Sequence, residues 1–381
     1  MKEIKGFKGN IYIEGKGIIP TSLSVENSKI KEIGNLNGDL LVLDDHMILV
    51  PGFVDKHIHG ANNSDSMYPS FDHILNISKT IASEGVTSYL ATTMTQSIEN
   101  IDSALRNLKD YINQKVDEGA ELLGIHLEGP FINKAFKGAQ PEEYILKCDV
   151  DTFKHFEEVS GDNIKNVTLA YEENGKELTK YLASKNIVAS IGHSNATAKD
   201  VLEAAKNGVT SLTHAYNAMK GLHHREAGTL GGALLADEIY LEIIADLVHV
   251  SAEAIQILYR IKGKDKIIAV TDAMEAKHLP DGTFELGGQK VFVKGREARL
   301  ESGALAGSVL TMNQAIKNLK DVLNVSLTEA IDFATINPAK NLKIDDQKGS
   351  IKVGKDADFA VIDQDLNIYL TVRGGKIIFK K

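Results

Sequence analysis

The chain has 381 residues, of which 43% are hydrophobic and 25% are charged, and its formal net charge is −9. This composition is typical of a globular protein, and the lack of a Lys/Arg-rich block argues against a nucleic-acid partner. No apolar stretch approaches the roughly 18 residues that a membrane-spanning helix needs. The start lacks an apolar secretory signal and the single Cys148 cannot form an internal disulfide, so we expect a cytoplasmic protein without a membrane partner.

The two ends of the chain have the same pattern. Residues 1–50 contain short runs that alternate β-branched and polar residues, such as "GNIYIEGKGII", and residues 349–381 repeat this pattern. We expect the two ends to form one small β-sandwich domain, with boundaries at 1–50 and 344–381. The intervening residues 51–343 then form the larger domain.

Eight short apolar runs follow one another within that larger domain. They cover residues 49–57, 87–93, 122–129, 166–172, 187–193, 210–215, 241–249 and 266–272. Several intervening segments, such as 98–119 and 195–208, have helical periodicity, and two further amphipathic stretches follow at 306–323 and 327–342. Eight buried strands separated by helices predict an α/β fold, a (β/α)8 TIM barrel.

Ionisable residues recur at the carboxyl ends of these runs. They are His57, His59, His126, Glu128, His193, His214, Asp246, His249 and Asp272. Taken singly, such a histidine is more often a loop or capping residue, Glu128 could belong to a salt bridge, and Asp272 could cap a helix. In a barrel, however, the carboxyl ends of all strands meet on one face, which carries the active site.

The residue types indicate a metal site. Imidazole and carboxylate groups without a thiolate suit Zn²⁺, Fe²⁺, Mn²⁺ or Co²⁺. Alternation along a strand puts His57 and His59 on one side, where both can bind one ion. Asp272 would serve as a general base toward water. The residues alone therefore predict a metal-dependent hydrolase on a barrel.

Several motifs add a family resemblance. "PGFVDKHIHG", "TDA" at 271–273 and "GSIKVGKDADFAVID" are similar to the amidohydrolase superfamily. Within it, "GIHLEGPFIN", "IGHSNAT", "THAYNAM", "REAG" and "LAGSVLTM" resemble the N-acetylglucosamine-6-phosphate deacetylases. That family removes acetate from the amino-sugar phosphate and serves amino-sugar catabolism and cell-wall sugar recycling.

The resemblance also implies roles for individual residues. Glu128, His193 and His214 would bind the metal held in every member, while His57 and His59 would complete a second site bridged by Glu128. Asp272 would deprotonate the metal-activated water and then protonate the leaving amine. The substrate-binding residues implied are Ala139, Gln140, Asn217, Ala218, Arg225, His249, Leu305, Ala306, Gly307 and Ser308, with Arg225 pairing with the phosphate. One or two divalent metals, Zn²⁺ foremost, and a homodimer are also expected.

Three positions depart from the family pattern, and other functions stay open. Tyr171 stands where Pro is frequent, Leu247 where Gly is usual, and Gln140 where some members have His. The nearest alternative substrate is N-acetylgalactosamine 6-phosphate. More distant alternatives are another amidohydrolase, such as a cyclic amidase or dipeptidase, and a non-catalytic scaffold on the same barrel.

Overall fold

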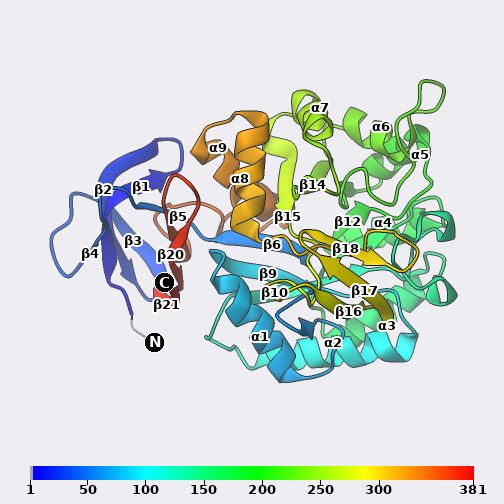
Figure 1. Cartoon of the computed structure of the whole chain (residues 1–381), viewed down its shortest axis with the longest axis horizontal. Helices are drawn as coiled ribbons and strands as arrows, with labels where there is room; N and C mark the ends of the chain where they lie inside the picture. Colours follow the sequence, from blue (N-terminus) through cyan, green and yellow to red (C-terminus); the bar gives the residue numbers. More distant parts are fainter. Residues whose placement is uncertain (1–2) are drawn as a thin grey trace.

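The computed structural model describes residues 3–381 and contains a barrel of parallel strands surrounded by helices (Figure 1). The eight barrel strands neighbour one another in chain order, and each overlaps one of the predicted apolar runs. They are β6 (Phe53–Ile58), β9 (Val86–Thr92), β10 (Glu121–Glu128), β11 (Ile164–Leu169), β12 (Val188–Ile191), β13 (Val209–Leu212), β14 (Tyr240–Ile244) and β15 (Ile267–Val270). The last strand lies against the first, since Asp272 N–H donates to the His57 carbonyl at 2.8 Å. The predicted barrel is confirmed.

Helices cover the outside of the barrel because each presents an apolar face to it. In α1 (Phe71–Ala82), for example, Ile74, Ile77 and Ile81 follow helical spacing and are fully or nearly fully buried. The others are α2 (Ile98–Asn113), α3 (Val150–Ser160), α4 (Gly175–Ser184), α5 (Ala198–Lys206), α6 (Gly228–Leu235), α7 (Ala252–Lys262) and α8 (Met312–Leu323). Strands enclosed on both faces read as continuous apolar runs, and all seven residues of β9 are buried.

The predicted helical stretch 327–342 divides into two helices, α9 (Leu327–Asp332) and α10 (Ile336–Asn341). Pro338 explains the division, because its ring would clash with the carbonyl four residues earlier in a continuous helix. Within the first turn of α10 the missing N–H of Pro338 costs little. Short 3₁₀ helices occupy Lys134–Phe136, Glu142–Tyr144 and Lys264–Lys266.

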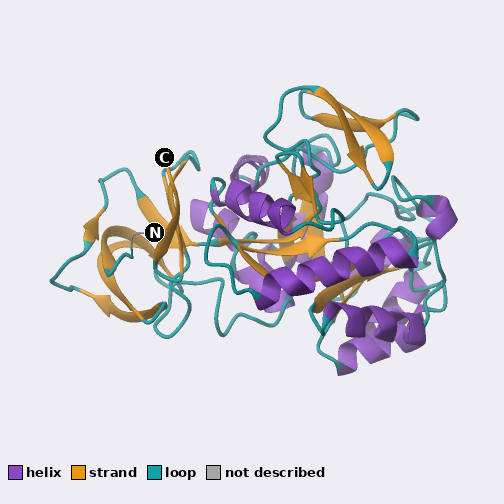
Figure 2. Ribbon diagram, turned by 90° about the horizontal axis from the view of Figure 1, so that it is seen from below, coloured by secondary structure: helices purple, strands orange, loops and turns teal. Residues whose placement is uncertain are grey.

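The two ends of the chain meet in a second sheet beside the barrel. This terminal sheet is strongly curled, as Figure 2 shows. Its strands form one hydrogen-bonded path in the order β21 (Lys376–Lys380), β20 (Ile368–Arg373), β19 (Phe359–Ile362), β5 (Ile48–Pro51), β1 (Gly6–Ile13), β2 (Gly17–Glu26) and β3 (Lys29–Gly34). The short β4 (Leu41–Val42) also pairs with β1. An apolar cluster that includes Phe7 and Phe359 fills this terminal sheet. The domain boundaries at 50/51 and 343/344 stay a prediction.

A small antiparallel sheet, which we did not predict, lies between the last barrel strand and α8. It consists of β16 (Gly282–Leu286), β17 (Gln289–Lys294) and β18 (Glu297–Leu300), and it projects beyond the barrel in Figure 2. A two-stranded hairpin, β7 (Gly60–Ala61) with β8 (Ser64–Asp65), follows His59. Across residues 3–381, no helix combines the length and apolar character needed to cross a membrane.

Candidate metal and catalytic site

The carboxyl ends of five barrel strands bring together six ionisable side chains. His57 lies in β6 and His59 follows it, Glu128 ends β10, and the remaining three each lie two residues beyond β12, β13 and β15. These three are His193, His214 and Asp272. All six are buried. The structure thus brings together the residues that the sequence predicted as metal ligands and as the general base.

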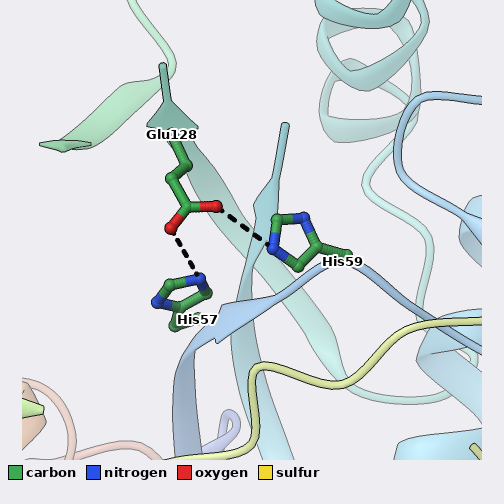
Figure 3. Close-up of side chains that lie close together, drawn as sticks. All are labelled: His57, His59 and Glu128. Atoms are coloured by element: carbon green, nitrogen blue, oxygen red, sulfur yellow. Dashed lines mark ion pairs between the residues drawn. The ribbon is translucent and has the colours of Figure 1, made fainter. Parts of the chain in front are cut away.

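Glu128 lies between two pairs of histidines. Its Oε1 is 3.5 Å from His57 Nε2, and its Oε2 is 3.3 Å from His59 Nε2, as Figure 3 shows. We call His57, His59 and Glu128 the first group. The same Oε1 also lies 3.4 Å from His193 Nε2 and 3.1 Å from His214 Nε2. We call Glu128, His193 and His214 the second group.

Asp272 lies beside the first group. Its Oδ1 is 3.3 Å from His57 Nε2 and 3.2 Å from His59 Nε2. The same carboxylate lines the cavity above the barrel. It is therefore within reach both of the candidate ligands and of a molecule in that cavity.

The charges of the site favour a cation. Burial alone would raise the pKa of Glu128, but His57 and its other histidine neighbours hold that pKa well below the usual range. Burial alone would lower the pKa of His59, yet the hydrogen bonds that its ring donates to Asp272 and Glu128 raise that pKa to about 9. Two ionised carboxylates in a buried space thus draw positive charge to this point.

The residues fit a divalent metal. In each group, one ligand atom from each of the three residues lies within 4.8 Å of those of the other two. His57 Nδ1 is 3.0 Å from Glu242 Oε2, whereas its buried Nε2 has no hydrogen-bond partner among residues 3–381. A nitrogen left free in this way beside a carboxylate suits a metal ligand, and the N/O donor set is the one expected without thiolates.

The backbone at the strand ends is strained. His193, His214 and Asp272 have φ values of 48°, 30° and 47°, in the left-handed region that non-glycine residues seldom adopt. Each such residue costs of order 1–3 kcal/mol and persists where the surrounding structure enforces it. With this backbone conformation His193 and His214 reach Glu128, and Asp272 reaches His57 and His59.

A cavity of about 390 Å³ opens above both groups. It is lined by His59, Glu128, His193, His214 and Asp272, together with the predicted substrate residues Ala139, Gln140, Asn217, Ala218, His249, Leu305 and Gly307. Four predicted residues do not line it. His57, Ala306 and Ser308 are buried beneath its wall, and Ser308 Oγ donates to the Thr271 carbonyl at 2.6 Å.

Arg225 is the fourth predicted residue outside the cavity. Its side chain is exposed, with Nη1 2.8 Å from His224 Nε2. The loop that carries it precedes α6, and Arg225 is not among the described residues that line the cavity. Its expected contact with a phosphate stays a prediction.

Gln140, which stands where some family members have His, is held by both ends of its amide. Its Oε1 accepts from Thr95 N–H at 2.7 Å, and its Nε2 donates to Glu128 Oε2 at 3.0 Å. The side chain therefore fixes the orientation of the central carboxylate from within the cavity wall.

The other two departures from the family pattern have different settings. Tyr171 does not line the cavity, and its hydroxyl accepts from Asn207 Nδ2 at 2.9 Å. Leu247 has φ 63°, a conformation that explains why glycine is usual there. Despite Leu247, His249 reaches the cavity, with its Nδ1 2.7 Å from Asp246 Oδ2.

Sequence reasoning missed three residues around the site. Lys56 and Glu242 form a fully buried ion pair of 2.9 Å below the first group, and Arg299 of β18 lines the cavity. A signal for Glu242 was available, because a carboxylate inside the apolar run 241–249 is as costly to bury as Glu128. His126, another of the ionisable residues at the strand ends, hydrogen-bonds Thr168 Oγ1 at 2.7 Å and packs against the His57 ring.

Comparison of the chain with known proteins identifies its family. The model of the amidohydrolase family matches residues 48–378. The chain belongs to the amidohydrolase family. Within the family, it is 44% identical to an N-acetylglucosamine-6-phosphate deacetylase of Lysinibacillus sphaericus, over 86% of this chain and 85% of that protein.

Two further proteins are similar to the chain over most of their length. An N-acetylgalactosamine-6-phosphate deacetylase of Escherichia coli O157:H7 is 36% identical, over 85% of this chain and 86% of that protein. The crystal structure of an N-acetylglucosamine-6-phosphate deacetylase from Thermotoga maritima has 36% identity and a TM-score of 0.90, covering 98% of this chain and 99% of the other.

Proposed function

We propose that the chain hydrolyses the N-acetyl group of N-acetyl-D-glucosamine 6-phosphate, giving D-glucosamine 6-phosphate and acetate. The observation that carries this proposal is Glu128 between two histidine pairs, with Asp272 beside them at the floor of a cavity. The 44% identity to a deacetylase of this specificity supports the choice of substrate.

Asp272 carries the proton through the reaction. Its burial alone would raise its pKa, but His57 and His59 hold the pKa well below the ordinary range, so the carboxylate is ionised at neutral pH. It takes a proton from the attacking water at a carboxylate oxygen and later delivers that proton to the nitrogen of the leaving amine. A divalent metal, when bound, would acidify the water and polarise the acetyl carbonyl.

We propose that each group holds one divalent ion, with Glu128 shared between them. Zn²⁺ is our first choice because the donors are imidazole nitrogens and a carboxylate, and Fe²⁺, Mn²⁺ or Co²⁺ share this preference in part. The second group, with Glu128, His193 and His214, would hold the ion on which water activation mainly depends. The first group would hold the other.

The rest of the cavity would bind the sugar phosphate. Asn217 and the backbone of Ala218 would face the phosphate, and His249 would contact the sugar or its phosphate. The residues that would surround the sugar and acetyl group are Ala139, Gln140, Leu305 and Gly307, with Ala306 and Ser308 buried behind them. Arg225 lies outside the cavity of its own protomer, so we propose a homodimer in which it completes the phosphate site of the partner. The exposed Leu222 on the same loop, with 63% of its surface accessible, suits such an interface.

We also propose a cytoplasmic location, in keeping with the free and buried Cys148.

Substrate competition tests this function. We expect kcat/KM to be highest for N-acetylglucosamine 6-phosphate, lower for N-acetylgalactosamine 6-phosphate and lowest for unphosphorylated N-acetylglucosamine. A preference for the galacto sugar would replace the substrate, and equal rates with and without phosphate would remove the phosphate site. Protein purified without chelator that held no metal, and gained no activity with Zn²⁺, Mn²⁺ or Co²⁺, would favour a non-catalytic scaffold.

A further inference from the structure

A buried ion pair lies inside the barrel directly below the first group. Lys56 Nζ is 2.9 Å from Glu242 Oε1, and both side chains are fully buried. Lys56 also donates to Asn341 Oδ1 of α10 at 2.6 Å and to Ser211 Oγ of β13 at 3.2 Å. The ammonium group is thus held by three different elements.

The ion pair is joined to the candidate ligands through the second oxygen of Glu242. Its Oε2 lies 3.0 Å from His57 Nδ1 and 3.4 Å from the backbone nitrogen of His214. One carboxylate therefore touches a side chain of the first group and the backbone that carries a residue of the second group.

This arrangement depends on an irregularity in β6. Neighbouring residues of a regular strand point to opposite faces, yet Lys56 and His57 both reach Glu242. The pairing of β6 with β9 shifts register between Asp55 and Ile58, which allows both side chains to turn inward. A second register shift lies earlier in the strand, between Phe53 and Val54, but the shift between Asp55 and Ile58 is the one that spans Lys56 and His57.

We propose that Glu242, held in place by Lys56, is a positioning residue for the metal site. Its carboxylate accepts the hydrogen of His57 Nδ1, which fixes the tautomer and directs the unprotonated Nε2 toward the ion. The inference rests on the proposed metal site and adds a role that the ligands themselves do not explain.

The chemistry requires both members of the pair. Carboxylates that accept from the second nitrogen of a metal-binding histidine orient the ring and raise its basicity. An unpaired carboxylate buried this deeply would be strongly destabilising, so Lys56 is the counter-charge that keeps Glu242 ionised where His57 needs it. His59 differs, since its buried Nδ1 has no hydrogen-bond partner among residues 3–381.

The test compares two buried ion pairs. Glu242→Gln weakens the link to His57, whereas Glu84→Gln breaks the pair of Glu84 with Lys277, 2.8 Å apart and equally buried, and Glu84 contacts none of the candidate ligands. Each purified variant is loaded with Zn²⁺, the bound metal is counted by mass spectrometry, and the dissociation constants are measured by competition with a chelator. Thermal unfolding is recorded on the same samples.

We expect both variants to lose thermal stability, but only Glu242→Gln to bind one Zn²⁺ equivalent roughly 10- to 100-fold more weakly. If Glu242→Gln does not fold, Glu242→Asp serves in its place, and its retained charge should give a smaller loss of affinity. Wild-type affinity at both equivalents, or an equal loss in Glu84→Gln, would overturn the positioning role. A wild-type protein that bound no Zn²⁺ would instead overturn the proposed function and the positioning role with it.

Discussion

Asp272 is the residue on which the proposed chemistry depends most. The change Asp272→Asn preserves shape but removes the proton acceptor, so we expect kcat to fall by roughly 10²- to 10⁴-fold, the usual contribution of a general base. The second group does not contact Asp272 through an ion pair and should retain its metal. Steady-state kinetics and metal analysis on one preparation check this, and near-normal turnover would exclude Asp272 as the base.

Leu247 offers a separate test of strain at a single residue. It has φ 63° and is 38% exposed, so its side chain contributes little burial while its Cβ opposes the backbone conformation. We expect Leu247→Gly to be more stable than Leu247→Ala by about 1 kcal/mol, since only glycine relieves the left-handed strain. Urea unfolding of both variants measures the difference, and a more stable alanine variant would contradict the expectation.

Individual site residues could be predicted where an ionisable residue follows an apolar run, because that pattern marks the carboxyl end of a strand. Glu128, His193, His214 and Asp272 each lie at the end of an apolar run or one residue before it, and parallel strands in a barrel bring such ends together. The location of Arg225 could not be predicted, because it lies on a loop whose path depends on tertiary contacts rather than on local pattern. The family resemblance implies a substrate-binding role for Gln140, whereas its hydrogen bond to Glu128 depends on the tertiary fold and has no signal in the sequence.

At the scale of the element, β6 supplies the two histidines of the first group. Replacing both, as His57→Ala with His59→Ala, should remove one metal equivalent and leave the ion of the second group bound. The reason is that the second group, Glu128, His193 and His214, takes no ligand from β6. Metal counting after dialysis checks this.

A matched double change at the second group, His193→Ala with His214→Ala, is the control for β6 and should abolish most activity. If the β6 variant lost every metal at once, the two groups would not be independent and the proposed order of binding would be wrong.

Most helices and strands could be predicted from the spacing of apolar residues, but the β16–β18 sheet could not. Exposed residues interrupt its short strands, so no apolar run marks them. A signal was present, because Gly287 and Gly288 have positive φ and separate two alternating segments as in a β-hairpin. This sheet brings Arg299 and Leu286 to the cavity, so part of the cavity wall was missed with it.

For the whole molecule, the histidine cluster predicts how stability depends on pH after metal removal. The folded-state pKa of His59 is about 9 and that of His57 is also raised, against about 6.5 for an unfolded histidine. Stability gained from these protonated rings is complete below pH 6.5 and is lost as pH rises toward 9. The loss is on the order of 3 kcal/mol for His59 alone.

Calorimetry of chelator-treated protein between pH 6 and 9 measures this loss. Zn²⁺-loaded protein is the control, since ligation requires neutral imidazoles and should leave a flatter pH profile. A Tm that stayed constant over this range without metal would show that the carboxylates do not hold protons on the cluster.

The barrel and the union of the two chain ends were predictable because both depend on patterns repeated along the sequence. The terminal sheet also has a consequence for how the protein is made. β5 pairs with β19, more than 300 residues later, so the amino-terminal strands leave the ribosome long before their partner exists. Contacts this distant close slowly and leave strand edges unpaired meanwhile. Completion of the terminal sheet is therefore a late event of synthesis, and until then the edge of β5 that pairs with β19 stays open.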